Sequence, residues 1–188
     1  PAHPGRVREG MKPSQRVIRT LWELEKPTIA AVNGVAAGLG AHLCWACDMV
    51  IAADTARFIE IFVRRGIALD AGGAFLLARH VGLHKAKELV FFGDELPADE
   101  AARLGLVNRV VPAAELEAKT REWATRLAEG PTFAIGLSKR LLNRSLEASM
   151  DQCFAEEAFT QALVANGEDM KEGIRSFMEK RPPRFTGR

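Results

Sequence analysis

The chain has 188 residues, of which 47% are hydrophobic and 27% are charged, and its formal net charge is +2. This size suits one globular domain with an appended helical part. The small charge gives no argument for a nucleic-acid partner, and no apolar run reaches the ~20 residues that a membrane span needs. Three cysteines without a signal peptide fit a reducing cytoplasm. We therefore expect a cytoplasmic protein that binds neither nucleic acid nor membranes.

The first predicted helix begins at Ser14, which is a favoured capping residue, and runs to about Glu25. Lys26-Pro27 ends it, since a residue that precedes proline is pushed out of the helical region. The segment before it, Pro1 to Pro13, has the composition of a polar loop. Because that segment has no start methionine and no apolar run, we expect the chain to begin in the middle of a longer protein.

A strand, a glycine-rich turn and a helix follow in close succession. The apolar run Thr28 to Val32 predicts the strand, the turn spans Asn33 to Gly40, and the helix opens near Leu39. The order of glycines is GxxxGxG, which does not match the dinucleotide fingerprint, and the Gly-Lys-Ser/Thr of a Walker loop is absent. The turn either directs backbone amides at a ligand or needs glycine only for a tight connection.

Three polar side chains near this turn are candidates for chemistry. Asp70 follows an apolar run and precedes Gly72 and Gly73, so it reads either as the N-cap of the next helix or as a proton shuttle. His42 is either a hydrogen-bonded structural histidine or part of a pocket wall. Strand alternation leaves the direction of Glu60 undecided.

The remaining pattern changes from mixed to purely helical. Further strands are predicted at Met49–Ala53, Arg57–Ile59 and Leu106–Pro112, with helices at Ala71–Gly82, Lys85–Phe92 and Ala98–Leu104, and then amphipathic helices at Ala114–Ala128, Thr132–Ser145, Met150–Val164 and Asp169–Lys180. Strands that alternate with helices favour an α/β fold with parallel pairing. We expect an α/β core over residues 1–125 and a helical region over 126–188.

Two clusters have a structural and a functional interpretation. Cys44 and Cys47 form a CxxC with no second pair, which favours two buried thiols over a zinc site, so no metal is expected. Near the C-terminus, Phe177, Lys180 and two arginines are either the basic last turn of a helix or a nucleotide-phosphate contact. His80 and His84 have no ligand partners at metal spacing and are expected at the surface.

The stretch from Lys26 to Phe58, KPTIAAVNGVAAGLGAHLCWACDMVIAADTARF, strongly resembles the signature of the crotonase superfamily of enoyl-CoA hydratases and isomerases. The likeness extends over about residues 15–188. It implies a ββα superhelix, with its N-terminal turns missing here, followed by a helical C-terminal trimerisation region. It also implies an acyl-CoA substrate, assembly as a homotrimer or dimer of trimers, and coenzyme A as part of the substrate with no permanently bound cofactor.

The resemblance also assigns roles to individual residues. It makes the amide of Leu39 one donor of an oxyanion hole, with Gly38 and Ala37 shaping the substrate site. The two glutamates of the hydratases correspond to His42 and Phe62, so that catalytic pair is lost, and both residues are expected to line the substrate site instead. Asp70 matches the acid of the GxxxDxGG pattern, which is typical of the phenylacetyl-type and dienoyl-CoA isomerases.

Phe177 and Lys180 resemble the residues with which a neighbouring subunit touches the coenzyme. We therefore expect an isomerase that uses Asp70. The alternatives are a hydratase or dehalogenase-like hydrolase, or a non-catalytic acyl-CoA-binding protein.

Overall fold

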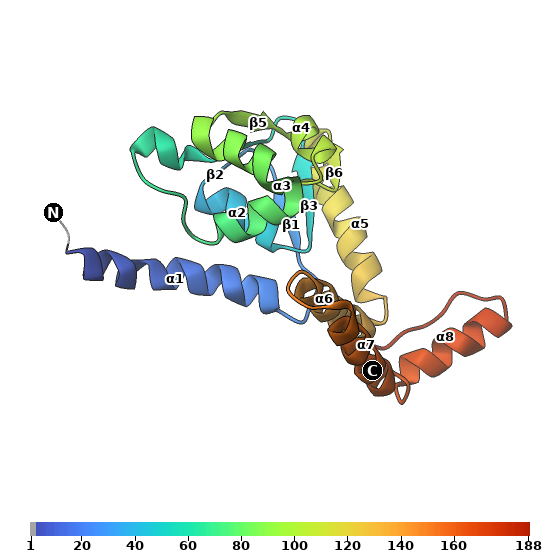
Figure 1. The fold of residues 1–188 in the computed structure, drawn as a ribbon. Coiled ribbons are helices and arrows are strands. Elements are labelled where there is room, and N and C mark those ends of the chain that lie inside the picture. Colours follow the sequence, from blue (N-terminus) through green and yellow to red (C-terminus); the bar gives the residue numbers. More distant parts are fainter. Residues whose placement is uncertain (1–2) are drawn as a thin grey trace. The chain divides into compact units, whose positions relative to one another are not determined.

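A computed structural model describes residues 3–188 of the chain (Figure 1). It divides into two compact units. The first comprises the residues up to Glu23 together with Thr28–Thr120, and the second comprises Leu24–Pro27 together with Arg121–Arg188.

The first unit carries all the strands that the structure describes, together with α1 to α4. Its elements are α1 (Pro4–Glu23), β1 (Ile29–Val32), β2 (Val35–Ala37), α2 (Leu39–Ala46), β3 (Met49–Ala53), β4 (Arg57–Ile59), the 3₁₀ turn η1 (Ile61–Arg65), α3 (Gly73–Phe92), β5 (Glu95–Pro97), α4 (Ala98–Arg103), β6 (Arg109–Val111), the 3₁₀ turn η2 (Ala113–Glu115) and the start of α5 (Leu116–Ala128). The predicted mixture of strands and helices is confirmed.

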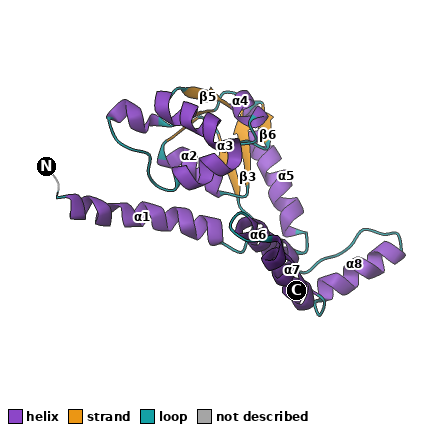
Figure 2. Cartoon of the chain, in the orientation of Figure 1, coloured by secondary structure: helices purple, strands orange, loops and turns teal. Residues whose placement is uncertain are grey.

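The strands of the first unit form two small sheets. One has the order β1-β3-β6, with both pairs parallel, and the other has the order β2-β4-β5. In the second sheet β2 and β4 pair parallel, whereas β4 and β5 pair antiparallel. The middle strand β3 is apolar along its length because helices and strands cover it, and Val50 to Ala53 are all buried. Figure 2 shows these strands among the helices α2, α3 and α4.

The N-terminal segment corrects one prediction. Residues from Pro4 onward are helical rather than a loop, and residues 1–2 of the predicted loop lie outside the described residues. Proline at the first helical position costs no hydrogen bond, and the arginines, lysine and glutamate that follow favour helix. Pro13 is accommodated inside the helix, and Ser14 donates its hydroxyl to the carbonyl of Met11 instead of capping.

Two short strands were not predicted. β2 lies inside the glycine-rich segment that the sequence analysis treats as a turn, and β5 follows the Gly93-Asp94 turn. Both pair with β4, in the registers Ala37–Ile59 and Glu95–Ile59. A three-residue strand has almost no pattern of its own, so this pairing with a distant segment decides its conformation.

Helix α3 joins the two predicted helices across a break. Gly82 lies at the break with φ 73° and ψ 164°, a backbone conformation that suits glycine. The predicted helical segments on both sides of it are therefore confirmed. Gly105 follows the end of α4 and is left-handed with φ 82°, a common conformation just after a helix.

The second unit is helical, as predicted. It contains the end of α5, then α6 (Thr132–Ser145), α7 (Met150–Val164) and α8 (Glu168–Met178), and α6 packs against α7. Ser149 and Gln152 form a capping box at the start of α7. Several large apolar side chains are exposed in the isolated chain, among them Leu142, Met150 and Phe159 at 70%, 69% and 67%. Within residues 3–188, no helix has the length and apolar character that crossing a membrane requires.

Two cysteines, Cys44 and Cys47, and two histidines, His80 and His84, lie in surroundings that are typical of residues without a catalytic role. Cys44 lies in α2 and Cys47 follows it, and both thiols are free and half-buried rather than fully buried. Burial, reinforced by the neighbouring Cys47, raises the pKa of the Cys44 thiol to about 11. His80 and His84 are exposed, as predicted. Across the described part of the chain, no three His, Cys, Asp or Glu side chains gather as metal ligands would.

Candidate active site

The glycine-rich segment places a backbone donor at the start of a helix. α2 begins at Leu39, which is 38% exposed, and Gly38 precedes it. The amide of Gly38 donates to the carbonyl of Ile59 at 2.9 Å, which fixes the segment to the end of β4. The first amides of a helix have no intrahelical acceptor and lie at the positive end of its dipole. The Leu39 amide therefore occupies a position where it could hold an oxyanion.

Gly38 is required here for two reasons. Its φ of 52° and ψ of −118° lie in a region that residues with a Cβ rarely adopt. A Cβ at this position would also lie 3.3 Å from the ring of Phe62, a tight contact against a buried side chain. Phe62 thus packs directly beside the turn that presents the Leu39 amide.

Asp70 lies in the loop between η1 and α3 and is half-buried. Its carbonyl accepts a hydrogen bond from the amide of Gly73 at 2.9 Å. The N-cap of α3 is Gly72, and no side chain caps this helix, so the interpretation of Asp70 as an N-cap is wrong. Ala71 and Gly72 both have positive φ, 42° and 82°. A non-glycine residue in that conformation is strained, and such strain is common in loops that position functional groups.

His42 and Glu60 form a buried pair that the sequence left open. His42 is 0% and Glu60 2% exposed. Nε2 of His42 lies 3.0 Å from Oε1 and 3.3 Å from Oε2 of Glu60. An ionised carboxylate only accepts hydrogen bonds, so beside an ionised Glu60 the donor in this contact is Nε2–H. Among the described residues, Nδ1 of His42 is buried without a hydrogen-bond partner. His42 is therefore the hydrogen-bonded core histidine that the sequence analysis gives as one interpretation, and Glu60 points inward.

The imidazole ring of His42 links the two parts of the site. Phe62 stacks on one face, with ring centroids 5.5 Å apart and planes 12° from parallel. The ring edge lies against Gly73, where a Cβ would be 2.4 Å from both Cε1 and Nε2. His42 therefore contacts, on one side, the ring that packs on Gly38 and, on the other, the glycine that is hydrogen-bonded to Asp70. The fold thus brings Gly38, Leu39, His42, Phe62 and the Asp70 loop into one region of the first unit.

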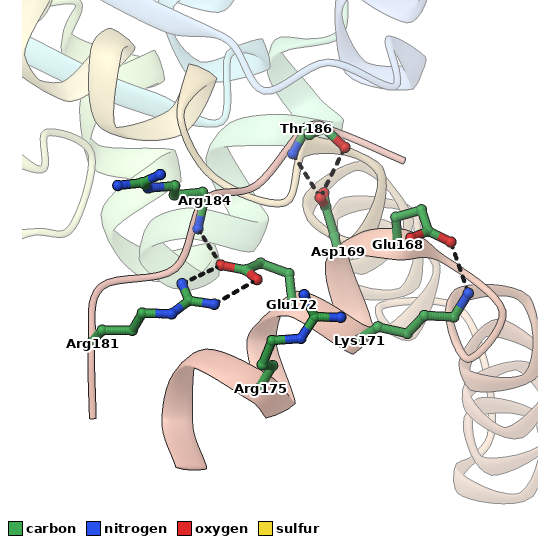
Figure 3. Close-up of a pocket in the computed structure, with 8 residues that line it drawn as sticks. All are labelled: Glu168, Asp169, Lys171, Glu172, Arg175, Arg181, Arg184 and Thr186. Atoms are coloured by element: carbon green, nitrogen blue, oxygen red, sulfur yellow. Dashed lines mark hydrogen bonds and ion pairs between the residues drawn. The ribbon is translucent and has the colours of Figure 1, made fainter. Parts of the chain in front are cut away.

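The predicted coenzyme contacts lie elsewhere, in the second unit. Phe177 is 81% exposed near the end of α8, and Lys180 is exposed just beyond it with a φ of 52°. Neither residue lines the hollow that α8 forms with the C-terminal segment (Figure 3). That hollow has a volume of about 540 Å³, and eight mostly charged residues line it: Glu168, Asp169, Lys171, Glu172, Arg175, Arg181, Arg184 and Thr186.

Two carboxylates in this hollow hold the C-terminal segment against α8. Glu172 accepts from the Arg181 guanidinium at 2.6 and 3.0 Å and from the backbone amide of Arg184 at 2.8 Å. Asp169 accepts from the amides of Thr186 and Gly187 at 2.7 and 2.9 Å, as the dashed lines to Thr186 in Figure 3 illustrate. Both carboxylates therefore bind groups of the same chain. Their contacts hold residues 181–187 against α8, and we call this set of contacts the C-terminal clamp.

We expect this clamp to loosen in acid. Hydrogen bonds from Arg181, and then from the Arg184 amide, lower the pKa of Glu172 from 4.5 to about 2. A carboxyl whose pKa is lower in the folded state contributes fully above its unfolded value and loses that contribution as pH falls to the folded value. Amide hydrogen exchange should therefore show residues 184–187 better protected in the wild type than in Glu172→Gln at pH 7, with the difference gone near pH 2. Glu157→Gln removes an exposed charge of the same unit and should leave the protection unchanged. Equal protection in Glu172→Gln at pH 7 would contradict the clamp.

Comparison with known proteins identifies the family of the chain. The family model for enoyl-CoA hydratase/isomerase matches residues 6–188. The chain is 39% identical over 172 residues to the 1,2-epoxyphenylacetyl-CoA isomerase of Escherichia coli, covering 92% of this chain and 66% of that protein. It is 40% identical over 166 residues to the short-chain-enoyl-CoA hydratase of Clostridium acetobutylicum, covering 88% of this chain and 64% of that protein.

The structural likeness is equally close. The crystal structure of an enoyl-CoA hydratase/isomerase from Cupriavidus metallidurans matches with a TM-score of 0.94 and 38% identity, over 98% of this chain and 70% of that one. The chain belongs to the enoyl-CoA hydratase/isomerase family of the crotonase superfamily. It spans about two thirds of the length of the curated relatives it matches.

Proposed function

We propose that the protein shifts the double bond of an enoyl-CoA thioester, with Asp70 as the proton shuttle. The observation that carries the proposal is the identity of the side chains near the glycine-rich turn. A half-buried aspartate that caps no helix lies in the loop beside His42 and Phe62, the two positions where the hydratase resemblance would place glutamates. One carboxylate suffices for an isomerisation because the same group returns the proton that it removed.

In this mechanism the thioester oxygen accepts a hydrogen bond from the Leu39 amide. Asp70 takes an acidic α- or γ-proton from the acyl group, and the electron pair moves onto the oxygen as an enolate that the amide holds. The protonated Asp70 then gives its proton to a different carbon, and the carbonyl re-forms. The double bond has moved, no atom has been gained or lost, and the acid returns to its starting state.

The apolar wall of the site supports isomerisation over water addition. Phe62 is 6% exposed, stacks on His42 and packs beside Gly38. An aromatic ring here offers no group that could position or deprotonate a water molecule, and it takes up space that water would need. Asp70 therefore exchanges its proton with the substrate in a setting with little competing water.

The proposal also covers the coenzyme part of the substrate and the assembly of the protein. We expect no permanently bound cofactor, with coenzyme A as part of the substrate, and a homotrimer or dimer of trimers. Exposed apolar side chains in α6 and α7 support an association of copies. The exposure of Phe177 and Lys180 supports a role in touching the coenzyme of a neighbouring subunit. A cytoplasmic location stays a prediction.

A second candidate is water addition to a 2-enoyl-CoA. What favours it is that relatives of similar identity carry the hydratase name, such as the Clostridium acetobutylicum protein at 40% identity. Such a reaction needs a group that activates water, and the glutamate pair expected for that purpose is replaced by His42 and Phe62.

Incubating the whole protein with a 3-enoyl-CoA and with a 2-enoyl-CoA in deuterated water tests the proposal. We expect double-bond migration, with deuterium entering the product only to the extent that the proton held on Asp70 exchanges with the solvent before it is returned. Mass spectrometry gives the deuterium, and the ultraviolet absorbance of the conjugated thioester gives the bond position. Accumulation of a 3-hydroxyacyl product, without migration, would overturn the isomerase and support the hydratase.

A further inference from the structure

We propose that Glu60 is a positioning residue for the isomerisation: through its hydrogen bond to His42, it fixes the imidazole ring against Gly73 and so holds the Asp70 loop in place. This inference rests on the proposed function and extends it to a residue to which the family resemblance assigns no role. It starts from the only buried acid–imidazole pair that the structure records in residues 3–188, on α2 and just after β4.

A buried carboxylate needs a compensating partner. Glu60 is 2% exposed, and burying an ionised carboxyl without hydrogen bonds is strongly unfavourable. His42 supplies the donor, with Nε2 within 3.3 Å of both carboxylate oxygens. A hydrogen bond to a charged acceptor is about twice as strong as one between neutral groups. Glu60 therefore fixes both the tautomer and the orientation of the imidazole ring.

The orientation of the ring matters because it packs against two aromatic rings and its edge lies against Gly73. Phe62 stacks on it at 5.5 Å, and Trp45 lies 6.1 Å away on the same helix. The edge with Nε2, the atom that Glu60 holds, faces the Cα of Gly73. A ring rotated away from Glu60 would bring other atoms against the same glycine, where no space is left.

The backbone of Gly73 connects the His42 ring to the Asp70 loop. Its amide donates to the carbonyl of Asp70 at 2.9 Å, closing a turn through Ala71 and Gly72 in which both residues have positive φ. A strained turn is held only where its surroundings over-determine it. The ring of His42 is one such constraint, and Ile18 of α1 is another, 3.0 Å from the position of a Cβ on Gly72. Loss of the Glu60 contact should therefore let the turn, and the Asp70 carboxyl with it, move.

The test replaces Glu60 in the whole protein and measures kcat and KM for double-bond migration. Glu60→Met keeps the length and apolar packing but leaves Nε2 without an acceptor, and we expect kcat to fall about 100-fold, since a displacement of about 1 Å costs that much. KM should change less than threefold, because Glu60 is 2% exposed and so makes no contact with the substrate itself. Glu60→Gln keeps an acceptor oxygen and should restore kcat to within about tenfold of the wild type.

A double-mutant cycle distinguishes positioning from general damage. If Glu60 acts through Asp70, Glu60→Met should lower the residual rate of the Asp70→Asn variant less than threefold. An equal loss of about 100-fold in both backgrounds, or an effect confined to KM, would overturn the inference. Wild-type kcat in folded Glu60→Met would do the same. If Glu60→Met does not fold, Glu60→Asp replaces it, since aspartate is shorter by one methylene and its carboxylate lies farther from His42. The kcat of Glu60→Asp should fall at least tenfold. An unchanged kcat overturns the inference.

Controls separate this inference from the proposed function. Glu95→Gln makes the same chemical change as Glu60→Gln, but at an exposed glutamate that is paired with Arg57. It should leave kcat unaltered. If Asp70→Asn retains full activity, the proposed function fails whatever Glu60 does. If Asp70→Asn is inactive while Glu60→Met is not, only the positioning role fails. Nitrogen-15 chemical shifts of the His42 imidazole should show the proton on Nε2 in the wild type. In Glu60→Met they should show that the proton is no longer confined to that nitrogen.

Discussion

Asp70→Asn is expected to lower the rate of double-bond migration by roughly 1,000-fold, within the range that a general acid–base group contributes. Asparagine has nearly the same shape but cannot accept and return a proton, so the enolate is neither formed nor quenched. The carboxyl caps no helix, and the hydrogen bond in this turn is accepted by the Asp70 backbone carbonyl, which the substitution keeps. The loss should therefore fall on kcat with the folded structure and thioester binding preserved.

Three measurements make this prediction precise. Initial rates should show the fall in kcat, calorimetric titration with an unreactive acyl-CoA should show similar affinity, and thermal unfolding should show a similar midpoint. Asp94→Asn is the matched control, since Asp94 is an exposed residue of the same unit that pairs with Arg64. A rate in Asp70→Asn within tenfold of the wild type would remove Asp70 from the reaction and direct attention to another acid.

Gly73→Ala is expected to damage both stability and activity. A Cβ at this position would lie 2.4 Å from Cε1 and Nε2 of His42 and 2.7 Å from Cδ1 of Leu69. Those distances are too short for any side chain, so His42 must leave its place beside Glu60 or the Asp70 turn must open. Inserting atoms into a packed interior costs about 1–3 kcal/mol, and displacing the acid by about 1 Å should lower kcat about 100-fold.

Chemical denaturation and steady-state kinetics on the same preparation check this second prediction. Gly10→Ala is the control, because a Cβ at Gly10 meets nothing within 4 Å and the residue lies inside α1. Alanine there should stabilise the helix by about 0.5–1 kcal/mol and leave kcat unchanged. If Gly73→Ala unfolds at the wild-type denaturant concentration with wild-type kcat, the contact between His42 and the Asp70 turn does not constrain the site.

Local sequence determined the elements that carry their own pattern. The apolar run of β3 and the amphipathic runs of α6 and α7 were each predicted close to their observed bounds. The opening of α2 at Leu39 was predicted because a glycine-rich turn followed by a helical pattern marks such a start. The residues around that turn also carried the family resemblance, which the comparisons confirm.

Only the tertiary structure decided which side chains meet. The direction of Glu60 could not be read from a three-residue strand that ends just before it, since alternation needs a longer run and a known partner. Its pairing with His42, 18 residues earlier, depends on how α2 packs against the strands. The same holds for β2 and β5, which exist because β4 pairs with both. The family resemblance assigned roles to the Leu39 amide and to the candidate acid Asp70, whereas long-range packing alone supplied the Glu60–His42 contact.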